Sequence, residues 1–207
     1  MKKKAACILV IIFTFIMLTS CSTIKNKKEA EVVEVPEDLC EFMLSVIGKD
    51  VETAEKMVEM KYGLTLTRTG PEYKNSNVTN KPNYDSYHYQ ATFTEQGITF
   101  NGLSLEYSHL NKSREDGTVF RIGFGTGSMS LKEAEDCYQK FSDYFYSKLG
   151  ITAFVNTDAF DSDDYCTSSS FVKDGYTYYV DYYYSGHHDS ASVTVYCMTH
   201  DEAYYVF

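Results

Sequence analysis

The chain has 207 residues, carries a formal net charge of −10 at neutral pH, and contains 19 tyrosines but no tryptophan. Nucleic-acid binding depends on neutralising phosphates with Lys and Arg, so we expect no nucleic-acid partner for so acidic a chain. The length suits one compact domain that buries roughly 70% of the surface of its unfolded chain.

The first 20 residues have the organisation of an export signal. Three lysines precede an apolar run from Ala5 to Leu18, which is shorter than the roughly 20 residues that span a bilayer. The four residues that end at Cys21, LTSC, resemble the lipobox of bacterial lipoproteins. This resemblance implies cleavage before Cys21 and attachment of lipid to it, and an ordinary signal peptide with an incidental cysteine is the alternative.

The resemblance also implies a location. We expect residues 1–20 to be a signal peptide and the mature protein to be exported and held at the bacterial cell envelope, its membrane contact made through lipid on Cys21. Ser22 follows the cysteine in place of an acid, which resembles the pattern of lipoproteins sent to the outer membrane of Gram-negative bacteria. Loss of the three leader lysines lowers the formal charge to −13.

Residues 21–35 are polar, mixed in charge and free of aromatic side chains, which predicts a flexible tether. The remainder is expected to form one compact domain with a first half over 36–127 and a second half over 128–207.

The first half is predicted to contain two helices, a long loop and three strands. Apolar residues recur at helical spacing over 36–47 and 51–62, and 64–85 is rich in Gly, Pro, Asn and Thr, which favours a loop. Alternating residues predict strands over 86–94, 98–109 and 118–125. The residues expected on their core face are Leu103, Leu105, Tyr107, Phe120, Ile122 and Phe124.

The second half repeats the order of helix and strands. A Ser-x-x-Glu capping box at Ser130 opens a helix over 130–149, an acidic loop follows, and strands are predicted over 165–172, 176–184 and 191–199. We therefore expect an α+β fold in which helices pack an antiparallel β-sheet built from a duplicated α-β-β-β unit. The match of TFTEQGITF (92–100) to SFVKDGYTY (170–178) supports a duplication, and chance similarity of hairpins is the alternative.

Alternating glycines in RIGFGTGS (121–128) raise the question of a phosphate-binding loop. The preceding strand belongs to an antiparallel meander, and Ser128 stands where a third motif glycine would be, so the pattern does not indicate a nucleotide site. Pairing Leu105 with Ile122 instead places Gly102 opposite Gly125, with Gly123 on the same outer face. This strip without side chains is a candidate contact surface. The alternative interpretation is that the glycines only mark a bend or a bulge in the strand.

YTYYVDYYY (176–184) is the most unusual composition in the chain. Strand alternation sends Tyr179 and Tyr183 to the face opposite the other tyrosines of the run. Tyrosine suits recognition of proteins and glycans, although aromatic residues also simply favour strands. We take Tyr179, Tyr183 and the three outer glycines as candidate binding residues.

No metal or cofactor is predicted. The clusters at 187–189 and 200–202 join His to acids, but a meander places them at opposite ends of the last strand. The acidic loop lacks the glycine of a calcium loop, so only adventitious calcium binding is considered there. No nucleophile motif with its His and acid is recognisable, so no catalytic residue is predicted.

Four cysteines remain after the lipid site: Cys40, Cys137, Cys166 and Cys197. Export permits two disulfides among them, and free buried thiols are the alternative. A tight hairpin turn at 174–175 would set Cys166 opposite Tyr183 and Cys197 near the far end of that strand, by Tyr176. The sequence therefore predicts no bridge between Cys166 and Cys197.

These features together favour a non-enzymatic binding or assembly module whose aromatic and glycine-bearing sheet face meets an envelope protein or glycan. Two other hypotheses stay open. One is a hydrolase of envelope polymers that uses Asp161, Asp163 or Asp164, and the other is a small-ligand sensor with an enclosed apolar pocket.

Overall fold

The computed structural model describes residues 33–74, 84–108, 117–160 and 163–199. The chain divides into the segment Met1–Glu34 and a compact unit, Val35–Phe207, to which every element below belongs. The expected signal peptide, Cys21 and most of the expected tether lie outside the described residues. None of the described helices is long and apolar enough to cross a membrane.

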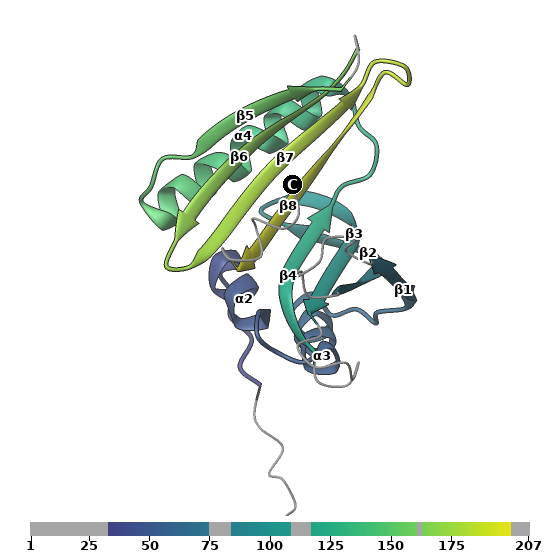
Figure 1. Cartoon of the computed structure of the whole chain (residues 1–207), viewed down its shortest axis with the longest axis vertical. Coiled ribbons are helices and arrows are strands. Elements are labelled where there is room, and N and C mark those ends of the chain that lie inside the picture. Colours follow the sequence, from purple (N-terminus) through teal and green to yellow (C-terminus); the bar gives the residue numbers. More distant parts are fainter. Residues whose placement is uncertain (1–32, 75–83, 109–116, 161–162, 200–207) are drawn as a thin grey trace, which may run out of the picture. The chain divides into compact units, whose positions relative to one another are not determined.

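The described strands form a single eight-stranded antiparallel sheet (Figure 1). In chain order the elements are α2 (Leu39–Val46), α3 (Val51–Tyr62), β1 (Arg68–Lys74), β2 (Tyr84–Glu95), β3 (Ile98–Ser108), β4 (Thr118–Gly125), α4 (Leu131–Leu149), β5 (Phe154–Ala159), β6 (Asp164–Lys173), β7 (Tyr176–Ser185) and β8 (Ser190–Thr199). The strand order is β1-β2-β3-β4-β8-β7-β6-β5. Thus β1 and β5 are the two edges, and the strands before and after α4 meet where β4 pairs with β8.

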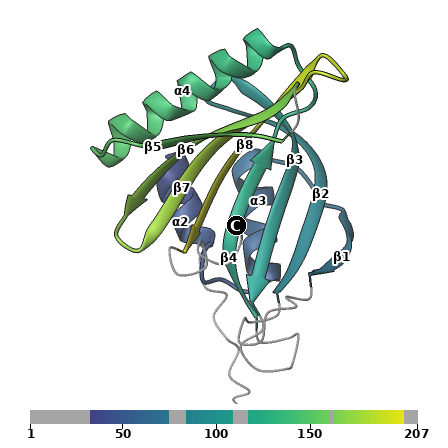
Figure 2. The same cartoon turned by 45° about the horizontal axis from the view of Figure 1, so that its top comes forward.

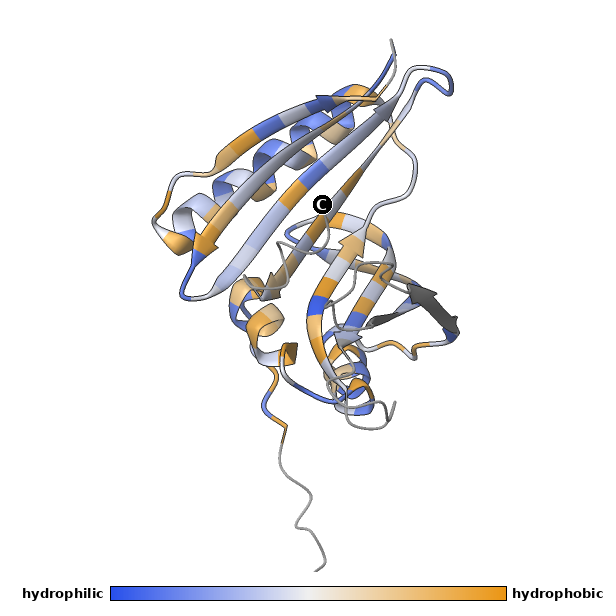
Figure 3. Ribbon diagram, viewed as in Figure 1, coloured by the Kyte–Doolittle hydropathy of each residue, from blue (hydrophilic) through white to orange (hydrophobic). Residues whose placement is uncertain are grey.

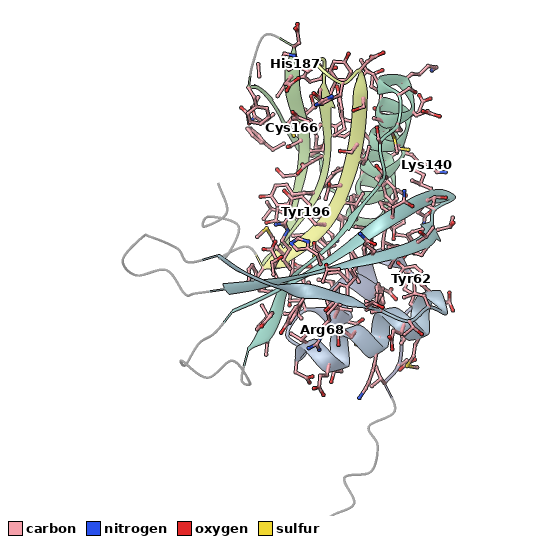
Figure 4. All side chains as sticks on the ribbon, turned by 90° about the vertical axis from the view of Figure 1, so that its right-hand side faces the viewer. Tyr62, Arg68, Lys140, Cys166, His187 and Tyr196 are labelled. Atoms are coloured by element: carbon pink, nitrogen blue, oxygen red, sulfur yellow. The ribbon has the colours of Figure 1, made fainter. Side chains whose placement is uncertain are left out.

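The described helices pack against one face of this sheet, which we call the helix face (Figure 2). Helix α4 contacts β6, β7 and β8, whereas α2 and α3 contact β4, and α2 also contacts β8. In Figure 4, Tyr62 and Lys140 lie on the helix side of the sheet, and Cys166 and Tyr196 lie on the opposite side. We call that opposite side the far face.

The expected α+β fold with a duplicated unit of one helix and three strands is wrong. The sheet dominates the structure. Among the described residues each half contributes four strands, and the first half has two helices where the second has one. The strands that the pattern misses are the two edges. β1 contains Gly70-Pro71 with a register shift beside it, and β5 is exposed along its whole length. Neither shows the alternation of apolar and polar residues that marks a half-buried strand.

The other elements confirm the predictions closely. The helix predicted from 130 begins at Leu131, and Ser130 caps it with the predicted capping box to Glu133. Asp174 and Gly175 have φ values of 52° and 82°, which suits the tight hairpin turn expected between β6 and β7. Pairs that the sequence predicts between β3 and β4 and between β6 and β7 are present, such as Leu105 with Ile122 and Cys166 with Tyr183.

Aromatic rings fill much of the core between the helices and the helix face. The ring of Phe100 lies 5.8 Å from that of Phe124 and 5.6 Å from that of Phe141, so β3, β4 and α4 meet in one cluster. One turn further along α4, Phe145 packs 5.8 Å from Phe171 of β6. Each of these rings is at most 1% exposed, and burial of one such side chain stabilises the fold by roughly 1.5–3 kcal/mol.

One predicted core residue lies on the wrong face. The ladder between β3 and β4 shifts register after Glu106, so Tyr107 pairs with Val119 and Phe120 is carried to the far face. There Phe120 forms a buried cluster with Tyr196 and Met198. The alternation was correct for Ile122 and Phe124 and failed only beyond the bulge.

Candidate binding surface

The predicted glycine strip exists on the far face. Gly102 pairs with Gly125, and Ser104 pairs with Gly123, as the predicted register requires. The three glycines nevertheless differ in their surroundings. A Cβ atom at Gly123 would lie 2.9 Å from Ser104 Oγ and 3.3 Å from the Cβ atom of Tyr196, whereas one at Gly125 would have nothing within 4 Å. Internal packing thus explains Gly123, and the main chain is bare at Gly125.

Tyr179 lies on the far face in a stack of rings and charges. Its ring stacks on that of Tyr196 at 4.6 Å, and the Arg121 guanidinium lies 4.1 Å from the centre of the Tyr196 ring. Arg121 also forms an ion pair of 2.9 Å with Glu106, whose side chain is only 4% exposed. Tyr179 is therefore half-buried and anchored to the sheet by its neighbour.

Asp181 follows Tyr179 by two residues on β7 and lies on the same face of the sheet. Its Oδ1 atom is shielded from solvent and has no hydrogen-bond partner among the residues that the structure describes. Burial raises the pKa of the Asp181 carboxyl, and the hydroxyls of Ser168 and Tyr196 and the charge of Arg121 offset the rise only in part. The far face therefore carries a carboxyl group that is costly to ionise.

Tyr183 is the more exposed of the two predicted tyrosines, at 40%. Its hydroxyl donates to Asp164 Oδ2 at 3.0 Å, and the backbone N–H of Gly186 donates to Asp164 Oδ1 at 2.9 Å. Desolvation acts to raise the pKa of Asp164. Hydrogen bonds from the Tyr183 and Ser185 hydroxyls and from the Gly186 N–H outweigh it and hold this pKa below its ordinary value. Asp164 is thus a hydrogen-bond acceptor at a hairpin, and Asp161, its partner in the hydrolase hypothesis, lies outside the described residues.

His187 and His188 lie beside Asp164 at the turn between β7 and β8 and border a hollow of about 380 Å³. No group of three or more His, Cys, Asp or Glu side chains that could hold a metal ion occurs within the described ranges. The second predicted cluster, 200–202, lies outside them.

The four cysteines are free thiols. Cys166 pairs with Tyr183 as predicted, and Cys197 pairs with Tyr178, one same-face position from the predicted neighbour Tyr176. The two thiols lie on opposite faces of the sheet, since Cys166 points to the far face and Cys197 lies in the helix-face core. This arrangement confirms that Cys166 and Cys197 cannot form a bridge.

Large exposed apolar side chains gather around β5, the edge strand that the sequence did not predict. All six residues of β5 are exposed, and among the described strands β5 pairs with β6 alone. We define the edge patch as the exposed side chains of β5, β6, β7 and the residue after β5: Phe154 (73% exposed), Val155 (57%), Phe160 (67%), Val172 (50%) and Tyr183 (40%). In Figure 3 the start of β5 is coloured as hydrophobic although it lies at the rim of the sheet.

A groove of about 540 Å³ runs beside this edge, between α4 and the helix face of β5, β6 and β7. Two carboxylates and three tyrosine rings line it together with Val155: Glu135, Asp143, Tyr138, Tyr146 and Tyr182. No Lys or Arg is among its lining residues. The Tyr138 and Tyr182 rings meet edge to face at 5.2 Å, and Gln139 donates to Asp143 Oδ1 at 2.8 Å.

Sequence reasoning found Tyr183 and missed the rest of the edge patch and the groove. A signal for the edge was present, because Phe154 and Val155 form a short strand-favouring pair soon after the Gly150 that ends α4. The groove had no such signal, since residues of α4 and of three strands form it and only the packing of α4 brings them together.

No protein-family model, curated protein or solved structure matches this chain.

Proposed function

We propose that this chain is a lipid-anchored, non-catalytic protein-binding module of the bacterial cell envelope, and that it binds its partner through β5 and the edge patch. The observation that carries this proposal is the exposure of every β5 residue at an edge of the sheet. A strand paired on one side only offers backbone N–H and C=O groups to another extended chain. The same contact would cover the exposed apolar side chains of β5 itself, Phe154 and Val155.

The exposed edge favours a protein over a glycan, because a strand edge pairs with a polypeptide backbone. Most of the described residues with large exposed apolar side chains belong to the edge patch, and only Met60 and Tyr146 lie elsewhere. The far-face residues Tyr179, Gly102, Gly123 and Gly125 stay a second predicted contact. Tyr183 belongs to both surfaces.

Site-directed photo-cross-linking tests the binding surface. We would place a photoreactive phenylalanine analogue at Phe154 in the full-length protein, expressed in its own host, and at Met60 as a control of similar exposure on α3. We expect discrete protein adducts from position 154 and none from position 60. Equal adduct patterns from both positions, or none from either, would contradict binding through the β5 edge.

Metabolic labelling with a fatty-acid analogue tests the anchor. We expect label on the wild-type protein and on Cys166→Ala, and none on Cys21→Ala. Label that persists after Cys21→Ala would overturn the anchoring proposal without affecting the proposal for β5.

A further inference from the structure

Resting on the proposed function, we propose that the partner segment is an extended basic peptide that adds to the sheet as a ninth strand beside β5 and places a Lys or Arg side chain in the groove next to α4. Four features of the described structure carry this inference: the state of the edge, the charge of the groove, its aromatic lining and the direction of the side chains.

The two edges of the sheet differ in their readiness to pair. β1 contains Pro71, which has no N–H to donate, and its ladder with β2 is irregular beside that residue. β5 contains no proline and no lysine, and its ladder with β6 is regular from Phe154 to Ala159. Proline, lysine and bulges are the usual devices that protect an edge, so β5 is the receptive one.

The groove has an excess of negative charge that the described residues do not neutralise. Neither Glu135 nor Asp143 takes part in an ion pair among the described residues. The cations of α4 and β6 lie elsewhere: Lys132 pairs with Asp136, Lys148 pairs with Asp38, and Lys173 donates to the carbonyl oxygen of Leu149. Lys140, the cation nearest to Asp143 in sequence, has its ammonium group beside Gly97 in the turn between β2 and β3. An incoming cation would therefore find two carboxylates that no cation among the described residues holds in an ion pair.

Aromatic rings in the same groove add a second attraction for a cation. Tyr138, Tyr146 and Tyr182 present rings beside the two carboxylates, and Tyr146 is 58% exposed. The face of a tyrosine ring attracts ammonium and guanidinium groups, while the long apolar stems of Lys and Arg pack on its carbon atoms. A basic side chain suits this lining better than an apolar or acidic one.

The direction of side chains along a strand links the edge to the groove. Val155 lines the groove, so the side chains of β5 with the same parity as Val155 point to the helix face. Alternate side chains of a ninth strand would point the same way, beside α4, and the others would lie on the far face near Phe154. A partner with alternating basic and apolar residues matches both surfaces.

A second copy of this chain fits less well. β5 carries one charged residue, Asp158, and no Lys or Arg, so pairing of two β5 strands would leave Glu135 and Asp143 without cations. The net charge of −10 also opposes association of two copies.

Fluorescence anisotropy with short synthetic peptides tests the inference, using the full chain purified in detergent. One peptide alternates Lys with Val, and a matched peptide alternates Glu with Val. We expect the Lys peptide to bind, to weaken as salt is added, and to bind about tenfold more weakly to Glu135→Gln, Asp143→Asn. The control variant Glu37→Gln, Glu41→Gln loses the same charge outside the groove and should bind as the wild type does.

Two further peptides test strand addition itself. N-methylation of alternate residues blocks the backbone donors along one edge of the peptide. We expect one methylation pattern to abolish binding and the other to preserve it. Equal binding of both patterns, equal binding of the Lys and Glu peptides, or equal effects of the two double variants would overturn the inference.

The outcomes separate the inference from the proposed function. If no peptide binds but cross-linking from position 154 still captures a partner, the basic strand is wrong and the β5 surface stands. If cross-linking also fails, both proposals fall.

Discussion

Gly123 and Tyr196 lie side by side on neighbouring strands of the far face, and their closeness shows how one missing side chain allows an aromatic stack to form. Tyr196 occupies the space that a Gly123 side chain would need, and from there its ring supports both Tyr179 and Arg121. Gly125, two residues later on the same face, has no neighbour of this kind. Two glycines with the same predicted role therefore differ in what they contribute to stability.

We predict that Gly123→Ala lowers the free energy of unfolding by roughly 1–3 kcal/mol, because the added methyl group must displace Ser104 or Tyr196. Gly125→Ala should change it by no more than about 0.5 kcal/mol, since the space there is empty. Urea unfolding of the two variants measures the difference. Equal losses would show that the close approach at Gly123 is absent.

The carboxyl group of Asp181 makes stability depend on pH. Because burial raises its pKa in the folded state, the unfolded chain loses this proton first as pH rises above about 3.9. The free energy of unfolding of the wild type therefore falls as pH rises, until the pH passes the raised pKa of Asp181 in the folded state. Above that pKa the loss of stability stays constant. Asn cannot ionise, so Asp181→Asn escapes this loss.

We predict that the stability of Asp181→Asn relative to the wild type increases from about pH 4 upward and then levels off. Urea unfolding at several pH values between acid and neutral measures it. Asp136→Asn, on an exposed part of α4, provides the comparison. A difference between Asp181→Asn and the wild type that does not vary with pH would contradict the raised pKa.

Among the helices, α4 has clear sequence signals at both ends and contacts three strands of the sheet. Its capping box begins it, Gly150 in the left-handed conformation ends it, and its apolar stripe covers β6, β7 and β8. Since its outer flank also forms one wall of the groove, the position of its first turn matters for the candidate site.

We predict that Ser130→Ala destabilises the protein by about 1 kcal/mol, because the Glu133 backbone N–H loses its side-chain acceptor. Ser128→Ala, in the exposed turn just before the helix, should have little effect. Thermal unfolding followed by circular dichroism compares the two variants, and equal shifts in Tm would argue against a role for the cap.

The elements also show how far sequence reasoning reaches. The pairing of β3 with β4 as far as Glu106 and the pairing of β6 with β7 were predicted, because alternation and the turn at Asp174-Gly175 determine them locally. The bulge after Glu106 was not predicted. The edges β1 and β5 were missed because an edge strand need not bury a face. The candidate surface was missed with them, since β5 forms the rim on which the edge patch and the groove depend.

At the scale of the molecule, a single sheet connects both halves of the chain through the pairing of β4 with β8, without a covalent link among the described cysteines. Cys197 and Cys40 are 0% and 5% exposed, and burial raises the pKa of both thiols, that of Cys40 to about 11. Cys137 and Cys166 are less buried. The reactivity of the buried thiols therefore indicates whether the sheet is folded.

We predict that an alkylating reagent at neutral pH modifies Cys137 and Cys166 of the native protein well before Cys40 and Cys197, in a form of the chain that begins at Ser22. All four should react in denaturant without any reductant, because none is bridged. Peptide mapping by mass spectrometry identifies the modified residues. Fewer than four reactive thiols in denaturant would reveal a disulfide.

The contrast between the two rims of the sheet limits how copies of the molecule can assemble. A fibril grows when each subunit presents two complementary ends, so that every addition creates a new place for the next one. Here the irregular, proline-bearing β1 offers a poor start for another strand, and growth can proceed from β5 only. Pairing of two copies through β5 would occupy the β5 edges of both copies at once, so the difference between the two edges opposes polymerisation.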